Sequence, residues 1–351
     1  GLATPVAIMV GTGLGAEHGI LVKSAESLER ASDIDTVVLD KTGTITQGKP
    51  LVTDVIGIDL LVAAAIEKNS GHPLAKAIVA EAMEMMENEP DGIIDEIPEA
   101  EAFEEYPGRG VRAILDDEVF FAGNRAMMEE RGFDADFEMG STMSATGKTV
   151  IYFIRDGEYA GLVALRDGPK PTSLEAVRRL EGMGIDVVML TGDNAETAEA
   201  IKEKVGIDKV YSQVLPADKD RVIAELQEGG NKTVAMVGDG INDAPAISRS
   251  DVGIAIGSGS DIALDSADIV LVRDDLCDVS KTIGLSNRVM RSIRQNLFWA
   301  LCYNVICIPV AAGVLYPFTG WLMSPELGAA CMSLSSVCVV CNALRLKLQK
   351  L

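Results

Sequence analysis

Residues 36–44 read TVVLDKTGT, in which a short run of β-branched and apolar residues ends at an acidic side chain, Asp40. A continuous apolar run of this length is typical of a strand that is buried on both faces of a parallel sheet. Similar runs occur at 187–190, 234–237, 252–256 and 269–272. Helical patterns separate them, at 173–183, 195–205 and 219–228. The alternation predicts βαβ units in an α/β fold with an open, doubly wound parallel sheet.

The region from 51 to 159 differs from the rest of the chain in its hydrophobic pattern and its content of acidic residues. It holds a long helix candidate from about Pro73 to Glu87, several short alternating strands and many acidic residues. We interpret 51–159 as an α+β domain inserted into the first domain, whose two parts are 15–50 and 160–280. Its Gly147-Lys148-Thr149 is similar to the end of a phosphate-binding P-loop. That motif needs Gly at position 142, which holds Thr142, so we exclude a Walker-type site.

Charge and hydrophobicity divide the chain. Its net charge is -22 although 48% of its 351 residues are hydrophobic, and almost every acidic residue precedes Arg294. We expect two membrane-spanning helices within 281–351, at about 297–316 and 327–344. Basic residues flank this pair on both sides, which predicts that both its ends and the catalytic domains are cytoplasmic. The acidic remainder argues against binding of nucleic acid.

Residues 1–14 are apolar, and we interpret them as the cytoplasmic half of a further membrane helix. The glycine-rich segment 11–15 follows, and its spacing does not fit a dinucleotide-binding fingerprint. We expect a helix end or a hinge there.

Asp40 is the first candidate catalytic residue. In open α/β sheets, ligands bind just beyond the carboxyl ends of the strands, which is where Asp40 falls. A carboxylate at such a place can attack phosphorus and form an aspartyl phosphate, provided that a cation offsets the charge. Three later segments could complete the site: Thr191-Gly192-Asp193-Asn194, Lys219, and Gly238 to Asp243.

These segments together resemble a known family. Asp40 to Thr44 is similar to the phosphorylation motif of P-type ATPases, and Thr191 to Asn194 and Gly238 to Pro245 are similar to their two other phosphorylation-domain motifs. The resemblance implies a haloacid-dehalogenase-like phosphorylation domain with an inserted nucleotide-binding domain and C-terminal transmembrane helices. It implies ATP and Mg²⁺ as cofactors.

The resemblance also implies roles for individual residues. Asp40 would be the nucleophile, within a catalytic set that includes Lys41 and Asp193. Mg²⁺ would bind Asp40, Asp239 and the carbonyl of Thr42. The phosphoryl group would be contacted by Thr191, Gly192 and Lys219, while Asn242 and Asp243 would order the site.

Thr42 separates the two leading functional readings. In phosphatase relatives, a second Asp two residues after the nucleophile serves as general acid and base, and here that position holds Thr42. Without this proton shuttle, water should attack the phosphoenzyme slowly, which favours a pump. A phosphatase of haloacid-dehalogenase type with a membrane anchor is the alternative.

The inserted domain suggests a nucleotide site. Ser70-Gly71-His72-Pro73 is similar to the Ser-x-His-Pro segment of heavy-metal pumps, with Glu67 upstream, although an acidic residue is common where Gly71 stands. Gly108 and Gly110 resemble the glycine pair that lets adenine approach the backbone. The resemblance therefore assigns ATP binding to Glu67, His72, Gly108 and Gly110.

Polar residues in the expected spans indicate the transported ion. Tyr303 and Asn304, with Met332 and Ser336, are similar to the pattern of Cu(I)-exporting members, and soft ligands suit Cu(I). Ag(I) and Zn²⁺ are the alternatives, although zinc-type members would show a Lys and an Asp in these helices. Membrane lipid and a cytosolic copper chaperone are the implied partners.

Parts of the family pattern do not occur in the sequence. Family members carry a Cys-Pro-Cys triplet just before a segment like 1–5, and an actuator domain with a Thr-Gly-Glu loop. We therefore expect a C-terminal fragment of an integral membrane protein, which can load phosphate onto Asp40 but does not complete transport alone.

Overall fold

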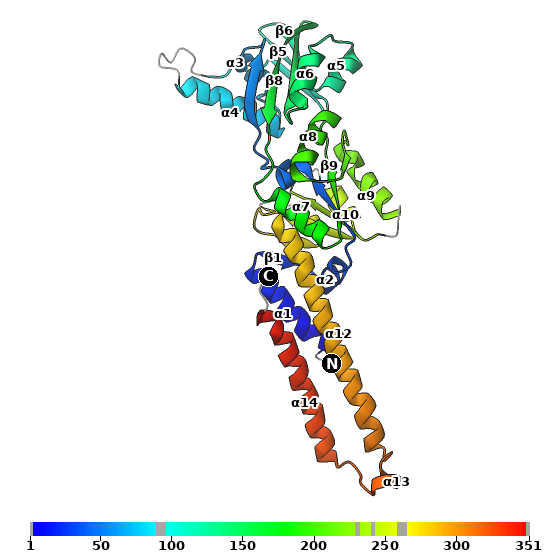
Figure 1. Ribbon diagram of the computed structural model, residues 1–351. Coiled ribbons are helices and arrows are strands. Elements are labelled where there is room, and N and C mark those ends of the chain that lie inside the picture. Colours follow the sequence, from blue (N-terminus) through cyan, green and yellow to red (C-terminus); the bar gives the residue numbers. More distant parts are fainter. Residues whose placement is uncertain (1–2, 89–95, 229–231, 240–242, 258–264, 349–351) are drawn as a thin grey trace.

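The computed structural model describes residues 3–88, 96–228, 232–239, 243–257 and 265–348. Figure 1 shows an elongated molecule with three parts in a row. A six-stranded sheet lies at one end, a seven-stranded sheet lies in the middle, and a helical hairpin extends from the other side.

The seven-stranded sheet has the order β1-β13-β12-β11-β2-β9-β10, and all its neighbours are parallel except β1 and β13. Its strands are β1 (Ile20–Val22), β2 (Thr36–Asp40), β9 (Asp186–Leu190), β10 (Lys209–Tyr211), β11 (Val234–Gly238), β12 (Val252–Ile256) and β13 (Ile269–Leu271). Side chains alternate between two cores, because Val37 and Leu39 point to one and Val38 to the other.

Helices cover both faces of this sheet. One core receives α7 (Ser173–Gly182) and α8 (Ala195–Val205), and the other receives α9 (Lys219–Glu228) and α10 (Ala244–Arg249). The short α2 (Ala25–Ala31) packs near β1 and β12. The doubly wound α/β fold is therefore confirmed.

The six-stranded sheet is antiparallel, with the order β3-β8-β7-β6-β5-β4. Its strands are β3 (Leu51–Ile56), β4 (Ala102–Tyr106), β5 (Gly110–Leu115), β6 (Glu118–Gly123), β7 (Thr149–Arg155) and β8 (Glu158–Arg166). Its helices are α3 (Leu60–Glu67), α4 (Pro73–Asn88), α5 (Arg125–Arg131) and α6 (Phe137–Ser144). Because β8 pairs with both β3 and β7, residues 160–166 lie in this sheet, although we expected them in the phosphorylation domain.

Side chains of β7 show why this sheet is covered on both faces. Ile151 and Phe153 enter the core under α3 and α4, whereas Val150, Tyr152 and Ile154 enter the core under α5 and α6. The inserted region thus has two small cores of its own. An independent pair of cores is what allows a chain segment to form a separate domain.

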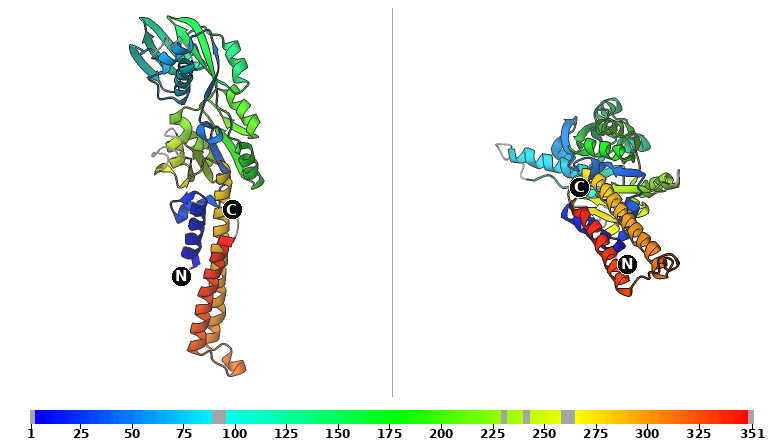
Figure 2. Two further views of the ribbon diagram at one scale, coloured as in Figure 1. Left: turned by 90° about the vertical axis from the view of Figure 1, so that its left-hand side faces the viewer. Right: turned by 60° about the horizontal axis from the view of Figure 1, so that its bottom comes forward.

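The hairpin begins with α12 (Cys277–Ala311), which leaves the seven-stranded sheet, and returns through α13 (Tyr316–Thr319), α14 (Pro325–Leu344) and η4 (Arg345–Leu348). Figure 2 shows α14 running beside α12, with the shorter α1 (Ala3–Glu17) against its upper part. The expected helix end or hinge at 11–15 is wrong, because α1 runs through this segment as one helix to Glu17. Gly11 permits close packing there, since a Cβ on it would lie 2.3 Å from Val289 Cγ2.

The hairpin differs from the two expected spans. Among the described residues, one helix is long and apolar enough to cross a membrane, Pro325–Leu348. The first expected span, 297–316, does not form one helix, because α12 ends at Ala311 and Gly313 turns the chain with a φ of +90°. Only residues 297–311 of this expected span are helical, as the last part of the 35-residue α12.

Candidate phosphorylation site

Asp40 ends β2 near the middle of the seven-stranded sheet, between β11 and β9. The chain then turns away through Gly43, whose φ is +73°. This turn directs the backbone N–H of Thr42 onto Asp40 Oδ2 at 2.9 Å. Asp40 is only 5% exposed, so its carboxylate is shielded from most of the solvent.

Lys219, the first residue of α9, reaches this carboxylate. Its Nζ lies 2.6 Å from Asp40 Oδ1 and 2.6 Å from Asp243 Oδ1, so one ammonium group bridges two carboxylates. Burial and the neighbouring Asp243 raise the pKa of Asp40 to about 6, and Lys219 opposes this. Burial acts to lower the pKa of Lys219, but the two carboxylates outweigh it and raise that pKa.

A cluster of carboxylates surrounds the same point. Oxygen atoms of Asp40, Asp239 and Asp243 lie within 4.8 Å of one another. Gly43 makes this possible, because a Cβ there would lie 1.7 Å from Asp239 Oδ2. Burial, together with the charge of Asp40, raises the pKa of Asp239 to about 6. Hard oxygen donors that repel one another in this way fit a small divalent cation such as Mg²⁺.

The loop after β9 supplies a second ion pair. Lys41 Nζ lies 2.6 Å from Asp193 Oδ2, with 8% and 16% of the two side chains exposed. Thr191 is buried, and its Oγ1 accepts a hydrogen bond from the Asp193 N–H at 3.1 Å. Asn194 caps α8 by accepting from the N–H of Thr197 at 2.8 Å. The loop that carries Gly192 is thereby fixed beside the turn that follows Asp40.

Two residues of this site were not expected from the sequence. Lys170 is buried, pairs with Asp274, and donates to the Gly43 carbonyl at 2.5 Å. Asp167 accepts from Thr46 Oγ1 at 2.5 Å. Both residues follow β8, which is a strand of the six-stranded sheet. We expected catalytic residues only at the ends of strands in the parallel sheet, and neither residue lies there. The segment Asp167-Gly168-Pro169-Lys170 directly after a strand was the available signal.

The nucleotide candidates lie in the six-stranded region. Glu67 is buried at the end of α3, and burial, with a contribution from Glu105, raises its pKa to about 8. His72 precedes α4, and its Nδ1 accepts from the N–H of Leu74 at 3.2 Å. That bond places the ring at the helix start in its neutral form, and desolvation lowers the pKa of His72 although Glu105 opposes this.

The two glycines have different surroundings. Gly108 has a φ of +71°, and its carbonyl accepts from Asn124 Nδ2 at 2.9 Å. Gly110 has a φ of +154°, and a Cβ there would lie 2.1 Å from the carbonyl oxygen of Ala122. The space beside Gly110 is therefore filled by β6, so strand pairing alone requires a glycine at this position.

The two parts of the site approach each other. A Cβ on Gly108 would lie 2.8 Å from Leu215, which precedes the Lys219 helix. Besides desolvation, the charge of Lys41 lowers the pKa of His72 and that of Asp193 raises it, so both charges lie within reach of the ring. The nucleotide candidates thus face the edge of the sheet where Asp40 lies.

Not every candidate is brought into a site. Asn242 and the side chain of Tyr303 lie outside the described residues. Asn304 is exposed on α12, Met332 is 67% exposed on α14, and Ser336 Oγ donates to the Met332 carbonyl at 3.3 Å. Among the described side chains, no hydrogen bond links Asn304 to either residue of α14.

Comparison with known proteins identifies the family. Residues 34–251 match the family model of the haloacid dehalogenase-like hydrolases. A copper-transporting P-type ATPase of Rhizobium leguminosarum bv. viciae is 47% identical over 100% of this chain and 42% of its own length. A silver-exporting P-type ATPase of Salmonella typhimurium is 46% identical over 99% of this chain and 42% of its own length.

Solved structures give the same picture. A zinc-transporting PIB-type ATPase in its E2.Pi state superposes with a TM-score of 0.70, at 33% identity, over 98% of this chain and 55% of the other. Two structures of the catalytic domain of the CPx-ATPase CopB-B are each 32% identical to this chain. One superposes with a TM-score of 0.61 over 78% of this chain and 96% of the domain, and the other with a TM-score of 0.60 over 79% and 98%. The chain belongs to the haloacid dehalogenase-like hydrolases and, within them, to the P-type ATPases. It spans less than half the length of the curated relatives named above.

Proposed function

We propose that this chain is the phosphorylation, nucleotide-binding and C-terminal membrane part of a pump that uses ATP to move Cu(I) across a membrane. The observation that carries the proposal is the buried Asp40–Lys219–Asp243 arrangement at the end of β2. This arrangement presents the fixed carboxylate of Asp40 to an incoming phosphoryl group and keeps the ammonium group of Lys219 beside that carboxylate.

The chemical step follows from this arrangement. A carboxylate oxygen of Asp40 attacks the γ-phosphorus of ATP, an O–P bond forms, and the bond from phosphorus to the β–γ bridging oxygen breaks as ADP leaves. Lys219 offsets negative charge at the attacking group, and the Thr42 N–H holds that group in orientation. Mg²⁺, when held by Asp40, Asp239 and the Thr42 carbonyl, would neutralise charge on the phosphoryl oxygens.

Other residues would position the phosphoryl group and the base. Thr191 and Gly192 lie in the loop that Asp193 ties to Lys41, and there they would donate to phosphoryl oxygens. On the other sheet, a neutral His72 would flank adenine, and Glu67, protonated at neutral pH, would donate a hydrogen bond to it.

The persistence of the phosphoenzyme distinguishes a pump from a phosphatase. Thr42 carries no group that accepts a proton from an attacking water, so the aspartyl phosphate should be long-lived. Replacing Thr42→Asp should restore a general base and speed decay of the phosphoenzyme by about 10²-fold in a chase experiment. Thr42→Asn introduces a side chain of the same shape as Asp that cannot act as a base, so its phosphoenzyme should decay at the rate of the parent. Fast decay of the parent protein would favour the phosphatase instead.

Cu(I) is the ion that we propose as substrate. Copper appears in the name of the Rhizobium leguminosarum relative and silver in that of the Salmonella typhimurium relative, while one of the structural neighbours is titled a zinc-transporting ATPase. Tyr303, Asn304, Met332 and Ser336 would be ligands for it, and we propose membrane lipid and a cytosolic copper chaperone as partners. ATP hydrolysis by the whole protein should be stimulated by Cu(I) and Ag(I), and stimulation by Zn²⁺ alone would refute the copper assignment.

A further inference from the structure

A basic cavity lies between α12 and α14, where the two helices leave the folded part of the molecule. Its volume is about 220 Å³. Three arginines and three polar side chains line it: Arg288, Arg291, Arg345, Ser292, Gln295 and Asn342. None of its lining residues belongs to the phosphorylation site, so that site does not account for the cavity.

The lining carries positive charge and no acidic residue. Neither Arg291 nor Arg345 forms an ion pair with a carboxylate anywhere in the part of the chain that the structure describes. Guanidinium groups that converge on one cavity repel one another unless an anion lies between them. Arginine in particular matches the geometry of a phosphate group, because its planar N–H donors bind two oxygens at once.

A buried hydroxyl adds an independent observation. Ser292 is 4% exposed, lines the cavity, and its Oγ has no hydrogen-bond partner among the described residues. Asn342, on the facing helix, donates to Asn296 Oδ1 at 2.9 Å, which fixes the two walls relative to each other. An unsatisfied buried hydroxyl costs free energy, and a ligand oxygen inside the cavity would satisfy it.

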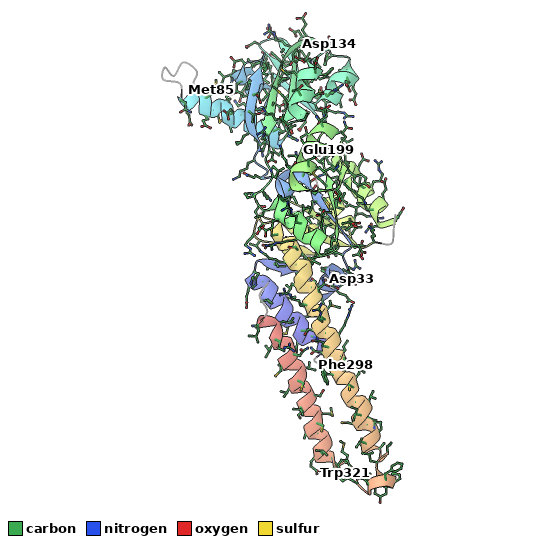
Figure 3. All side chains as sticks on the ribbon, in the orientation of Figure 1. Asp33, Met85, Asp134, Glu199, Phe298 and Trp321 are labelled. Carbon is green, nitrogen blue, oxygen red and sulfur yellow. The ribbon has the colours of Figure 1, made fainter. Side chains whose placement is uncertain are left out.

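The position of the cavity indicates where the anion comes from. On one side, α12 and α14 pack into the buried cluster that contains Val289 and Ala343. On the other side, exposed apolar residues begin at Leu297 and continue along both helices toward Trp321. Figure 3 labels Phe298 and Trp321 near the two ends of this apolar stretch. The cavity therefore lies where headgroups would meet an apolar layer, and acyl chains could follow the exposed helix surface below it.

We propose that this cavity binds the headgroup phosphate of an anionic phospholipid. Basic pockets between membrane helices at the headgroup level are suited to this ligand. Continuity with the apolar surface favours a lipid over free phosphate, which has no apolar part to bury. The proposal rests on the membrane location included in the proposed function.

The two tryptophans of the chain provide a direct test, since they report on opposite ends of the apolar stretch. Trp299 lies one helical turn beyond Gln295, so the variant Trp321→Phe reports on the cavity, and Trp299→Phe reports on the far end. The 351-residue chain is placed in phosphatidylcholine vesicles that contain either brominated phosphatidylglycerol or brominated phosphatidylcholine. Quenching of each tryptophan is measured against the mole fraction of brominated lipid.

We expect Trp299 to show a roughly tenfold preference for phosphatidylglycerol, and Trp321 to show none. The double variant Arg291→Gln, Arg345→Gln should reduce that preference to about twofold or less. Arg294→Gln is the matched control, because Arg294 is exposed on the same helix and does not line the cavity. It should keep the preference.

Three results would overturn the proposal. They are an equal loss in the Arg294 control, no preference in the parent, and loss of the preference on adding inorganic phosphate, which would make free phosphate the ligand. If brominated phosphatidylcholine quenches neither tryptophan, the chain is not in the bilayer, and the membrane part of the proposed function fails. Quenching of both without a headgroup preference overturns the lipid site alone.

Discussion

The two sheets hold their candidate residues in opposite ways. At the seven-stranded sheet, Asp40, Lys219 and Asp243 are buried charges that touch one another directly. At the six-stranded sheet, Glu67 is buried and forms no ion pair with any of the described residues, and the exposed His72 lies at a helix start. The first arrangement is suited to fixing reacting atoms, and the second to receiving a flat, uncharged ring. Changes should therefore abolish chemistry at the first sheet and weaken binding at the second.

The largest effect should come from removing the bridging cation. Lys219→Met leaves two buried carboxylates facing each other. We expect the rate of phosphoenzyme formation to fall by about 10³-fold or more, which is the typical loss when one group that stabilises charge in the transition state is removed. Loss of one partner in a buried pair should also destabilise folding by roughly 3–5 kcal/mol. Labelling with γ-³²P-ATP and thermal unfolding measure the two effects. Lys232→Met, which removes an exposed pair with Asp186, is the control and should change neither.

Gly43 should be the next most sensitive position. Gly43→Ala places a methyl group 1.7 Å from the Asp239 carboxylate, so the cluster must move. We expect phosphorylation to fall by about 10²-fold and its dependence on Mg²⁺ to shift to higher concentration, since displacement of a catalytic group by 1 Å has a cost of this size. Gly132→Ala is the matched control, with a φ of +72° and open space around it. An equal loss in that control would show that backbone strain, not the cluster, is responsible.

A smaller effect is expected on the nucleotide side. His72→Ala should weaken ATP affinity by about tenfold, through a lost ring contact of roughly 1 kcal/mol or slightly more, and leave maximal phosphorylation nearly unchanged. Titration of labelling against ATP concentration separates the two quantities. His18→Ala, which changes the other histidine of the chain, should alter neither. Unchanged affinity in His72→Ala would return His72 to a purely structural role.

The smallest effect concerns Glu67 and pH. Its pKa in the folded protein, about 8, lies above its ordinary value of 4.5, so the folded state holds this proton more tightly than the unfolded state does. The resulting stability is complete below pH 4.5 and is lost as pH rises through 8. Glu67→Gln should flatten the fall in melting temperature between about pH 4.5 and 8 by a few degrees. Glu99→Gln, whose side chain is largely exposed, should leave that fall intact.

The same contrast explains what could be predicted from the sequence. The parallel sheet and the strand-end position of Asp40 were predictable, because buried strands read as continuous apolar runs and their ends meet at one edge. Lys170 was missed because it enters this edge from β8, a strand of the other sheet. The first membrane span was predicted too long, since hydrophobicity does not reveal that α12 ends at Ala311. The resemblance assigned Gly110 to the ATP site. Only the pairing of β5 with β6 shows that a Cβ at Gly110 would clash with the backbone of the neighbouring strand.

The most direct test is acid-quenched labelling of the chain with γ-³²P-ATP and Mg²⁺, comparing the parent with Asp40→Asn. We predict a label that is stable in acid, released by hydroxylamine, and absent in Asp40→Asn. A label of equal intensity in Asp40→Asn, or one that resists hydroxylamine, would contradict the assignment of Asp40 as the phosphorylated residue.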